Sequence, residues 1–521
     1  MNSIDLYSGI GGWTLGMKLS NINNVASYEW WHEANQTHNF NFNTNHKEID
    51  IRKIDVNSLS FGENIDFVVG SPPCTQFSYA NKGGNGDIAD GLLDIYKFLE
   101  IVDKLKPKYW AMENVPRVAG ILDKQIEKGG ALNRFKHLVK TIKVVDSADY
   151  GVPQNRKRMI AGDFPVNLFD SYKTNIKQVT LGQVLNSLKE DIITDPNYGY
   201  KIAKDEITEL ENEVSLTPQE ERINSDAKTF HPIYNKMSFP DKLNRPSRTV
   251  TATCTRVSRE SIIVKAEKGY RRLNVRERGV VQGFPITYQF YGRTLNAKFK
   301  MIGNAVPPIL TYYIFQSMLE VPLSDLKSPK NSSYYHNSPK FKAKQSNLGL
   351  PKRKFPEKRK FKFAVPNLRY GSGVRFELSN DPKSEGTPWS FKFYHGNSKN
   401  IKEVYLNREV KNALSPILNS TKNEVFKKSI EKIATTYADY KSSKLQQLWT
   451  ATELNNDVFN FLDDVGNAVE EILDKANLEN IDSSLVTAIT EESNKKIEEN
   501  KKSILTGFYF LSSLNHRIFN K

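Results

Sequence analysis

The segment Ser71–Ser78, with the sequence SPPCTQFS, carries one of only two cysteines in this chain of 521 residues. The apolar run before it, Ile65–Gly70, is typical of a buried strand. Prolines cannot continue the hydrogen-bonded ladder of a strand, so Pro72 and Pro73 predict a stiff turn. Cys74 therefore follows the carboxyl end of a strand, where α/β enzymes place reactive groups. A buried, unreactive thiol is the alternative, and this segment alone does not decide between the two.

A glutamate and two arginines follow other strand-like segments. Glu113 in MENVP comes just after a strand-like run and could donate a proton to a small substrate held beside Cys74. A glutamate that caps the next helix is the alternative. In YGVPQNRKRMI, Arg156 and Arg158 alternate, so both side chains can point the same way and hold an anion or a carbonyl oxygen. A solvated run of charges is the alternative here.

Three further segments carry the features of a nucleotide-like site. DLYSGIGG, residues Asp5–Gly12, contains glycines that let the backbone approach a ligand, and it opens a helix whose first N–H groups are free. After the second predicted strand, Glu29 is placed for ribose hydroxyls and Trp30 for covering an adenine. A surface acid beside a core tryptophan is the alternative for that pair. Asp55 and Val56 are placed to read an adenine edge. Together these segments predict an adenosine-containing cofactor at the carboxyl edge of the sheet.

A regular alternation of strands and helices is needed to bring these residues together. Strand-like segments alternate with helix-like ones along residues 1 to 165, and they are Ile4–Tyr7, Gly12–Leu19, Val25–Tyr28, Phe67–Val69, Leu92–Leu105 and Tyr109–Met112. Such alternation predicts an α/β fold with a mostly parallel sheet and helices on both faces.

The bulk composition limits the class of protein. Two cysteines, Cys74 and Cys254, cannot build a disulfide framework or a zinc site, and we expect no metal. The N-terminus has no signal-like pattern, and the longest apolar stretches are too short or too polar to span a bilayer, so we expect no membrane partner. The net charge of +15 indicates a polyanionic partner, nucleic acid before membrane.

The later part of the chain changes character twice. The periodic pattern loosens between about residues 166 and 268 and returns from Arg271 to Phe315. Between Lys327 and Lys362 there are twelve Lys or Arg residues and a single acidic one, Glu357, which predicts a basic, poorly ordered linker. Beyond it, alternation around residues 374–393 and helical spacing over residues 458–473 predict a separate, largely helical region.

Taken in order, DLYSGIGG, YEW, SPPCTQFS, MENV, QNRKR, RRLNVRERGVVQGFP and MIGNAVPP resemble the DNA (cytosine-5)-methyltransferase family of the bacterial restriction-modification type, over roughly residues 1 to 320. The resemblance implies a Rossmann-like S-adenosylmethionine-dependent methyltransferase sheet, with Cys74 as the thiolate that adds to C6 of a flipped cytosine. Glu113 would hold and protonate the base, and Arg158, with Arg156 in support, would contact its O2 side. The implied cofactor-binding residues are Asp5, Tyr7, Ile10, Gly12, Glu29, Trp30, Asp55, Val56, Pro73 and Asn304.

The resemblance also implies how the chain is divided. Residues 1–165, completed by 270–322, would form the catalytic and cofactor-binding domain, residues 166–269 an irregular target-recognition domain, and residues 323–363 the basic linker. Residues 364–521 would be a C-terminal α+β or mostly helical extension of unknown role. The segment from Thr75 to about Asp90 would close behind the flipped base.

The same resemblance sets the expected partners. We expect a cytoplasmic, DNA-associated enzyme that acts as a monomer on double-stranded DNA and is paired in function with a restriction endonuclease. An RNA (tRNA) cytosine-5 methyltransferase and a non-catalytic DNA-binding protein on the same scaffold are the alternatives. Methylation of an exocyclic amino group is a third, because SPPC resembles the motif of those enzymes, but they carry an aromatic residue in the place of Cys74.

Overall fold

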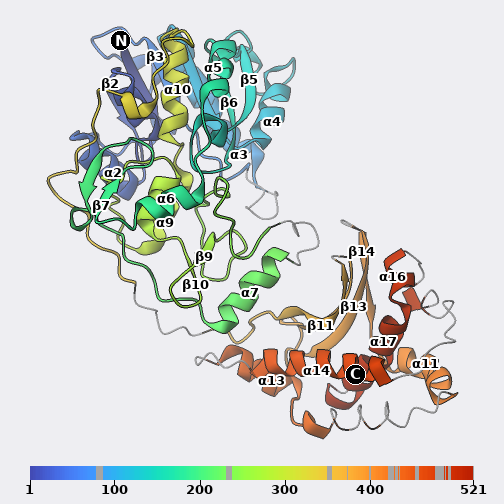
Figure 1. Cartoon of the computed structure of the whole chain (residues 1–521). Helices are drawn as coiled ribbons and strands as arrows, with labels where there is room; N and C mark the ends of the chain where they lie inside the picture. The colour runs from blue at the N-terminus through green and yellow to red at the C-terminus, as the bar shows by residue number, and fades with distance from the viewer. Residues whose placement is uncertain are drawn as a thin grey trace. The chain divides into compact units, whose positions relative to one another are not determined.

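A computed structural model describes the chain except for residues 78–85, 230–236, 349–354, 372, 398–399, 421–427, 429–431, 433–434, 452–456, 476–485, 487–488, 491–494 and 520–521 (Figure 1). The chain forms two compact units. Unit 1 comprises Met1–Ser215 and Pro240–Gly349, and unit 2 comprises Leu216–Phe239 and Leu350–Lys521.

Unit 1 is built on a six-stranded sheet with the order β2-β1-β3-β4-β6-β5. The strands are β1 (Asn2–Leu6), β2 (Asn23–Tyr28), β3 (Phe67–Gly70), β4 (Tyr109–Asn114), β5 (Thr141–Asp146) and β6 (Lys157–Asp163). The first four are parallel, and β6 runs antiparallel to both β4 and β5. The carboxyl ends of β1 to β4 therefore meet at one edge, which is where the sequence places its candidate residues.

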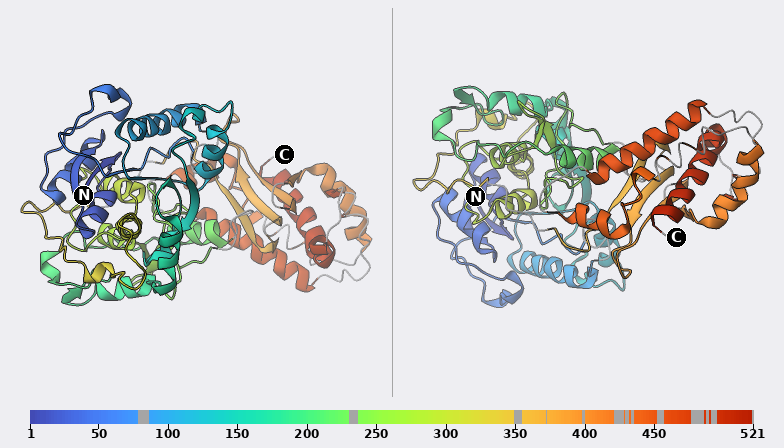
Figure 2. Two further views of the ribbon diagram at one scale, coloured as in Figure 1. Left: turned by 90° about the horizontal axis from the view of Figure 1, so that it is seen from above. Right: turned by 90° about the horizontal axis from the view of Figure 1, so that it is seen from below.

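Alternate residues of the strands feed two separate cores, because successive side chains of a strand point to opposite faces. Phe67 and Val69 of β3 pack into one core, and Val68 between them packs into the other. The first face carries α1 (Gly12–Leu19), α5 (Val166–Tyr172) and α10 (Pro308–Met318); the second carries α3 (Ile88–Leu105) and α4 (Arg117–Ile126) (Figures 1 and 2). The predicted doubly covered α/β sheet is confirmed.

The remainder of unit 1 is irregular and holds short elements. These are α2 (His32–Phe42), α6 (Leu181–Ser187), β7 (Ile192–Thr194), β8 (Lys201–Ala203), β9 (Ile263–Lys265), β10 (Tyr270–Arg272), α8 (Val275–Val281) and α9 (Leu295–Asn304). The α8 helix starts at a capping box, in which the Asn274 side chain and Glu277 satisfy each other's backbone N–H groups.

Unit 1 continues beyond the last helix as an extended strap, residues 328–348. Ser332 Oγ donates to the Leu19 carbonyl at 3.0 Å, and buried His336 accepts at its carbonyl from Thr287 Oγ1 at 2.7 Å. Further along, the Ala343 N–H donates to Gln289 Oε1 at 3.0 Å. This differs from the predicted poorly ordered linker, because the polar groups of the strap find partners on the catalytic unit that composition alone does not reveal.

Unit 2 contains a four-stranded antiparallel sheet in the order β11-β12-β13-β14. The strands are β11 (Lys362–Gly371), β12 (Val374–Asn380), β13 (Trp389–Asn397) and β14 (Asn400–Tyr405), and the helices are α7 (Pro218–Thr229), α11 (Arg408–Ser420), α13 (Ser442–Thr450), α14 (Asp457–Lys475), α16 (Lys495–Glu499) and α17 (Lys501–Ile518). The predicted alternation of β12 and β13 is confirmed by their register, in which Phe376 faces Phe393. The Asn515 side chain of α17 hydrogen-bonds both backbone groups of Phe391, which fastens this helix to the sheet.

One helix departs from the sequential division. Residues 216–239 fall inside the predicted target-recognition segment, yet α7 belongs to unit 2. Its Ile223 packs against the core of that unit, and its Arg222 pairs with Asp463 of α14 at 2.7 Å. The chain thus passes between the units at three points rather than at a single linker.

Candidate active site

A cavity of about 420 Å³ lies at the carboxyl edge of the parallel strands. Its volume is in the usual range for a small-molecule site. Six stretches of the chain supply its lining, which consists of Tyr7, Ser8, Gly9, Ile10, Trp13, Glu29, Trp30, Trp31, Ala34, Ser71, Pro72, Pro73, Cys74, Thr75, Glu113, Val115, Arg156, Arg158, Lys300, Met301, Gly303, Asn304, Ala305 and Val306.

Cys74 stands on the turn after β3, as its prolines predict. The side-chain amide of Asn114, at the end of β4, donates to the Pro72 carbonyl at 3.1 Å and ties this turn to the neighbouring strand. The thiol is half-buried and lines the cavity. Burial raises the pKa of the Cys74 thiol, and the positive charge of Arg158 offsets part of that rise. A cationic neighbour favours the thiolate form of a cysteine, which is the form that acts as a nucleophile.

Glu113 and Arg158 form a buried ion pair beside this thiol. Arg158 Nε lies 2.7 Å from Glu113 Oε1, and the two side chains are 12% and 7% exposed. They come from the adjacent strands β4 and β6, whose antiparallel pairing sets Glu113 opposite Ile160. The pair gives the cavity both a carboxyl group and a guanidinium donor, the groups that proton transfer and charge stabilisation require.

Arg156 makes different contacts from Arg158. Its side chain is 1% exposed, and it donates to the carbonyls of Val250 at 2.9 Å, Gly303 at 2.8 Å and Ala305 at 3.1 Å. It thereby joins the irregular region to the end of α9. Its Nε is buried and has no hydrogen-bond partner among the described residues, and Arg156 also lines the cavity.

Glu29 organises a second part of the cavity lining. One carboxylate oxygen accepts from the N–H groups of Trp30 and Trp31 at 2.9 and 2.7 Å, and the other accepts from Gly9 N–H at 2.8 Å. Burial raises the pKa of Glu29, and these three hydrogen bonds counteract the rise. Trp30 is 64% exposed, so its ring is free to cover a flat ligand.

The glycine-rich turn packs closely against the chain that follows α9. A Cβ at Gly12 would stand 2.2 Å from the Val306 carbonyl oxygen, so only glycine allows α1 to approach the chain after α9 this closely. Tyr7, just before the turn, has φ 57°, a conformation that costs energy in a non-glycine residue and often marks a functional site. Its hydroxyl donates to Asp94 Oδ1 of α3 at 3.2 Å.

Four of the predicted residues do not line this cavity. Gly12 lies beneath it, and Asp5 is fully buried, accepting from the Thr14 N–H at 3.2 Å and from its hydroxyl at 2.8 Å. Burial raises the pKa of Asp5 to about 8. Asp55 and Val56, at the start of a short 3-10 helix, line a separate cavity of about 290 Å³ with Lys97, Glu100 and Arg134. The other predicted residues, Tyr7, Ile10, Glu29, Trp30, Pro73, Cys74, Glu113, Arg156, Arg158 and Asn304, are brought together in the main cavity.

Sequence reasoning missed part of the lining. Trp13 donates from its indole to Ser71 Oγ at 3.0 Å, which links the glycine-rich turn to the cysteine turn. The Lys300 ammonium lies 4.9 Å from the centre of the Trp31 ring. Both tryptophans adjoin segments singled out above, and Lys300 directly precedes MIGNAV, so proximity to those segments was the available signal.

In the part of the chain that the structure describes, no group of three or more His, Cys, Asp or Glu side chains could hold a metal ion. No described helix is long and apolar enough to cross a membrane.

Comparison with known proteins identifies the family to which the chain is similar. Residues 1–320 match the family model described as C-5 cytosine-specific DNA methylase. Type II methyltransferase M.FnuDI of Fusobacterium nucleatum is 26% identical over 353 residues, an alignment that covers 61% of this chain and 94% of the relative. Type II methyltransferase M.NgoPII of Neisseria gonorrhoeae is 29% identical, with 60% and 94% covered. Type II methyltransferase M.MthTI of Methanothermobacter thermautotrophicus is also 29% identical, with 59% and 93% covered.

The match extends over more than half of the chain. The protein belongs to the C-5 cytosine-specific DNA methylase family and is a DNA cytosine-5 methyltransferase of the restriction-modification type. The relatives are covered almost completely by about three fifths of this chain, and the residues after 320 lie outside the family match.

Proposed function

We propose that this methyltransferase acts on a cytosine flipped out of a specific double-stranded DNA sequence, through a covalent bond between Cys74 Sγ and C6 of the base, with S-adenosylmethionine as methyl donor. The observation that carries the proposal is the shared cavity, which is lined by Cys74 and the Glu113–Arg158 pair and also by Glu29 and Trp30. A buried target base must leave its stack to reach Cys74, at a cost of a few kcal/mol.

The chemistry assigns a separate task to each side chain. The Cys74 thiolate bonds to C6, and the electron pair of the C5=C6 bond moves to C5, while Glu113 delivers a proton to N3. S-adenosylmethionine, when bound, supplies an electrophilic methyl group, which C5 takes while the broken C–S bond pair returns to sulfur. Loss of the C5 proton to water and departure of the thiolate restore the double bond, and Glu113 recovers its proton from N3. Arg158 offsets charge that develops on the O2 side of the base.

The lining residues Glu29 and Trp30 fit the proposed donor. A carboxylate offers about four acceptor positions, and Glu29 uses three on backbone N–H groups, which leaves one for a ribose hydroxyl. The exposed Trp30 ring can cover the adenine, as the sequence predicts. Asn304 and Pro73, which also line the cavity, would contribute to the donor's binding surface.

The partners remain part of the proposal. The net charge of +15 supports a DNA duplex as the polyanion, and we propose that one copy of the chain binds it. Because the relatives are named Type II methyltransferases, we also propose that a cognate restriction endonuclease recognises the same sequence. The predicted closing loop, residues 75–90, includes residues 78–85, which lie outside the described residues.

A trapping experiment tests the covalent step. A duplex with 5-fluorocytosine at the target position cannot lose a proton from C5, so the wild-type protein with S-adenosylmethionine should form an adduct that survives denaturant. Cys74→Ala should form none, and Cys254→Ala should form as much as the wild type. Adduct formation by Cys74→Ala would overturn the assignment, and an adduct on RNA but not on DNA would overturn the substrate.

A further inference from the structure

The strap, residues 328–348, lies beyond the part of the chain that the family model matches, yet it is anchored on unit 1. Lys298 of α9 donates to the Lys344 carbonyl at 2.6 Å and forms a buried ion pair with Glu209. Glu209 in turn accepts from the Ser346 N–H at 3.1 Å. The α9 helix also supplies part of the cavity lining. The end of the strap is therefore fixed to a helix that shapes the active site.

The middle of the strap packs on a tyrosine of unit 1. The His336 ring stacks against the Tyr288 ring, with 5.0 Å between the ring centres and 30° between the ring planes. Thr287, the residue before this tyrosine, donates from Oγ1 to the His336 carbonyl at 2.7 Å. Both rings belong to buried residues. Because a close-packed interior leaves a side chain little room, the strap restricts the positions that the Tyr288 ring can take.

The Tyr288 side chain reaches the glycine-rich turn. Its hydroxyl donates to the Ile10 carbonyl, and Ile10 lines the active-site cavity. The residue before it, Gly9, donates its N–H to Glu29 at 2.8 Å. Glu29 is the residue that we assign to the ribose of S-adenosylmethionine. One buried side chain thus connects the strap with the backbone that faces the proposed cofactor.

The peptide at Ile10 depends on contacts from outside the turn. Gly9 and Gly11, on either side of it, have φ 54° and 89°. Glycine permits many backbone conformations, so a residue between two glycines keeps one orientation only where neighbours hold it. A buried carbonyl that loses its donor also costs free energy. Removing the Tyr288 hydroxyl would therefore loosen the turn and deprive the Ile10 carbonyl of this donor.

We propose that Tyr288 and His336 are positioning residues for S-adenosylmethionine: Tyr288 fixes the Ile10 peptide, and His336 holds the Tyr288 ring in place. The strap is thereby a working part of the methyltransferase, although it lies beyond the family match. This inference rests on the proposed function, because it concerns the same cofactor site.

The test measures binding of S-adenosylmethionine to the full-length protein without DNA, by isothermal titration calorimetry, so the readout does not depend on turnover. Tyr288→Phe keeps the stacked ring and removes the hydroxyl, and it should raise Kd about tenfold. His336→Ala removes the stacking partner and should raise Kd about fivefold. Because only cofactor binding is affected, kcat at saturating S-adenosylmethionine and KM for DNA should stay within about twofold of the wild type.

Two matched controls separate positioning from a general loss of stability. Tyr312→Phe also removes a tyrosine hydroxyl that donates to a backbone carbonyl of unit 1, that of Lys327 at 2.9 Å. Ser333→Ala changes the strap at an exposed contact with Asn21. Both controls should bind S-adenosylmethionine like the wild type. Thermal melts without the cofactor should show similar losses of Tm in Tyr288→Phe and Tyr312→Phe, so that a difference in Kd between them reports on the turn.

The double variant tests whether His336 acts through Tyr288. Once the hydroxyl is absent, the position of the ring no longer affects the Ile10 carbonyl. The double variant should therefore bind S-adenosylmethionine within about twofold of Tyr288→Phe alone, because the two changes interrupt one connection. Losses that multiply would show that His336 acts by another route and would overturn its assigned role.

Two further outcomes would overturn the proposal. A wild-type Kd in Tyr288→Phe would show that the turn does not need this hydrogen bond. An equal rise in Kd in Tyr312→Phe would reduce the effect to a loss of stability of unit 1. Failure of the wild type itself to bind S-adenosylmethionine would instead count against the proposed function.

Discussion

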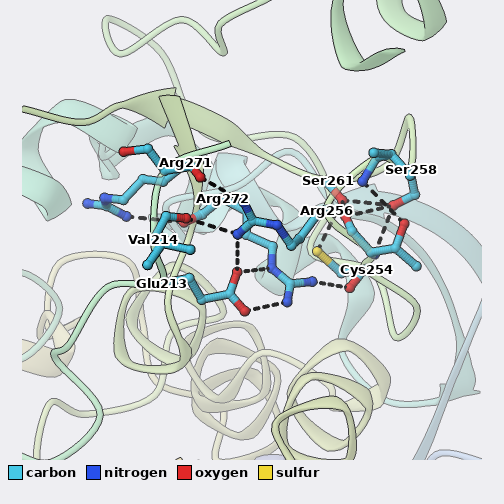
Figure 3. Close-up of polar contacts among 11 residues, drawn as sticks. Glu213, Val214, Cys254, Arg256, Ser258, Ser261, Arg271 and Arg272 are labelled. Carbon is cyan, nitrogen blue, oxygen red and sulfur yellow. Dashed lines mark hydrogen bonds and ion pairs between the residues drawn. The ribbon is translucent and has the colours of Figure 1, made fainter. Parts of the chain in front are cut away.

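The two cysteines stand in surroundings that are alike in residue type and opposite in use. Cys74 lies beside the Glu113–Arg158 pair, and Cys254 lies beside the Glu213–Arg272 pair, with ion-pair distances of 2.7 Å and 2.5 Å. The Cys74 thiol lines the same cavity as Glu113 and Arg158, whereas the Cys254 thiol is buried against Ser261 Oγ at 3.2 Å (Figure 3) and does not line the cavity of about 930 Å³ that Glu213 lines. The same three residue types thus share a cavity around Cys74, whereas around Cys254 the thiol lies outside the cavity that its glutamate lines.

The largest expected effect is the loss of turnover when Glu113 is replaced. Glu113→Gln should lower kcat by roughly 10²- to 10⁴-fold, the usual contribution of a positioned acid or base, because the amide cannot give its proton to the ring. Steady-state methylation at saturating DNA measures it. Glu320→Gln, which alters an exposed ion pair of the same unit, is the control and should keep wild-type turnover. A loss of less than tenfold would make Glu113 a structural residue.

Glu213→Gln should act on stability instead. Its side chain is 8% exposed and faces Arg272 and Arg256, which are 7% and 3% exposed, so the variant leaves two buried cations without their counter-charge. We expect a loss of about 2 kcal/mol or more in the free energy of unfolding. Urea denaturation followed by tryptophan fluorescence checks this. A stability equal to that of the wild type would mean that the backbone carbonyls around the two arginines compensate fully.

Alkylation should distinguish the two thiols by their reactivity in the native protein. Cys74 should react with iodoacetamide in the native protein, and Cys254 only after unfolding. Because burial raises the pKa of the Cys74 thiol, its alkylation rate should still increase with pH above the range where a free cysteine levels off. Arg158 lowers that pKa and Glu113 raises it, so Arg158→Gln should move the rate profile to higher pH and Glu113→Gln to lower pH. Shifts of the opposite sign, measured by mass spectrometry, would contradict this arrangement.

The smallest effect is expected at the second cysteine. Cys254→Ser keeps a donor that can reach Ser261 and changes the side-chain volume little, so the free energy of unfolding should fall by less than about 1.5 kcal/mol. The methylated sequence should not change, because the Cys254 side chain is buried. Bisulfite mapping with a chemical denaturation curve covers both points. A changed sequence preference would place Cys254 itself in the recognition surface.

Much of the site could be predicted from sequence because its residues follow strands. The positions of Cys74 and Glu113 rest on a general rule, that carboxyl ends of parallel strands meet at one edge, and the structure places both in one cavity. The distinct roles of Arg156 and Arg158 could not be predicted. Alternation puts both on one side of a strand, but only the packing of Val250, Gly303 and Ala305 around Arg156 engages its guanidinium with backbone carbonyls.

The division of the chain into its two units could not be predicted from the sequence. The loose pattern between residues 166 and 268 gives no sign that residues 216–239 belong with residues hundreds of positions later. Likewise, the basic composition after Lys327 favours disorder, whereas His336 and Ala343 are buried against unit 1. Composition indicates only how much free energy it costs on average to bury such a segment. A few hydrogen bonds to specific partners can offset that cost.

By itself, the sequence determined the α/β class, the parallel edge, the turn that carries Cys74 and the family, because each depends on local periodicity or on short ordered motifs. The tertiary structure decided that Arg158 pairs with Glu113 whereas backbone carbonyls engage Arg156, and that α7 belongs to unit 2. It also set Asp55 and Val56 in a cavity apart from Cys74. These properties depend on contacts between segments far apart in the chain, and neither residue type nor local spacing specifies which distant partner a side chain meets.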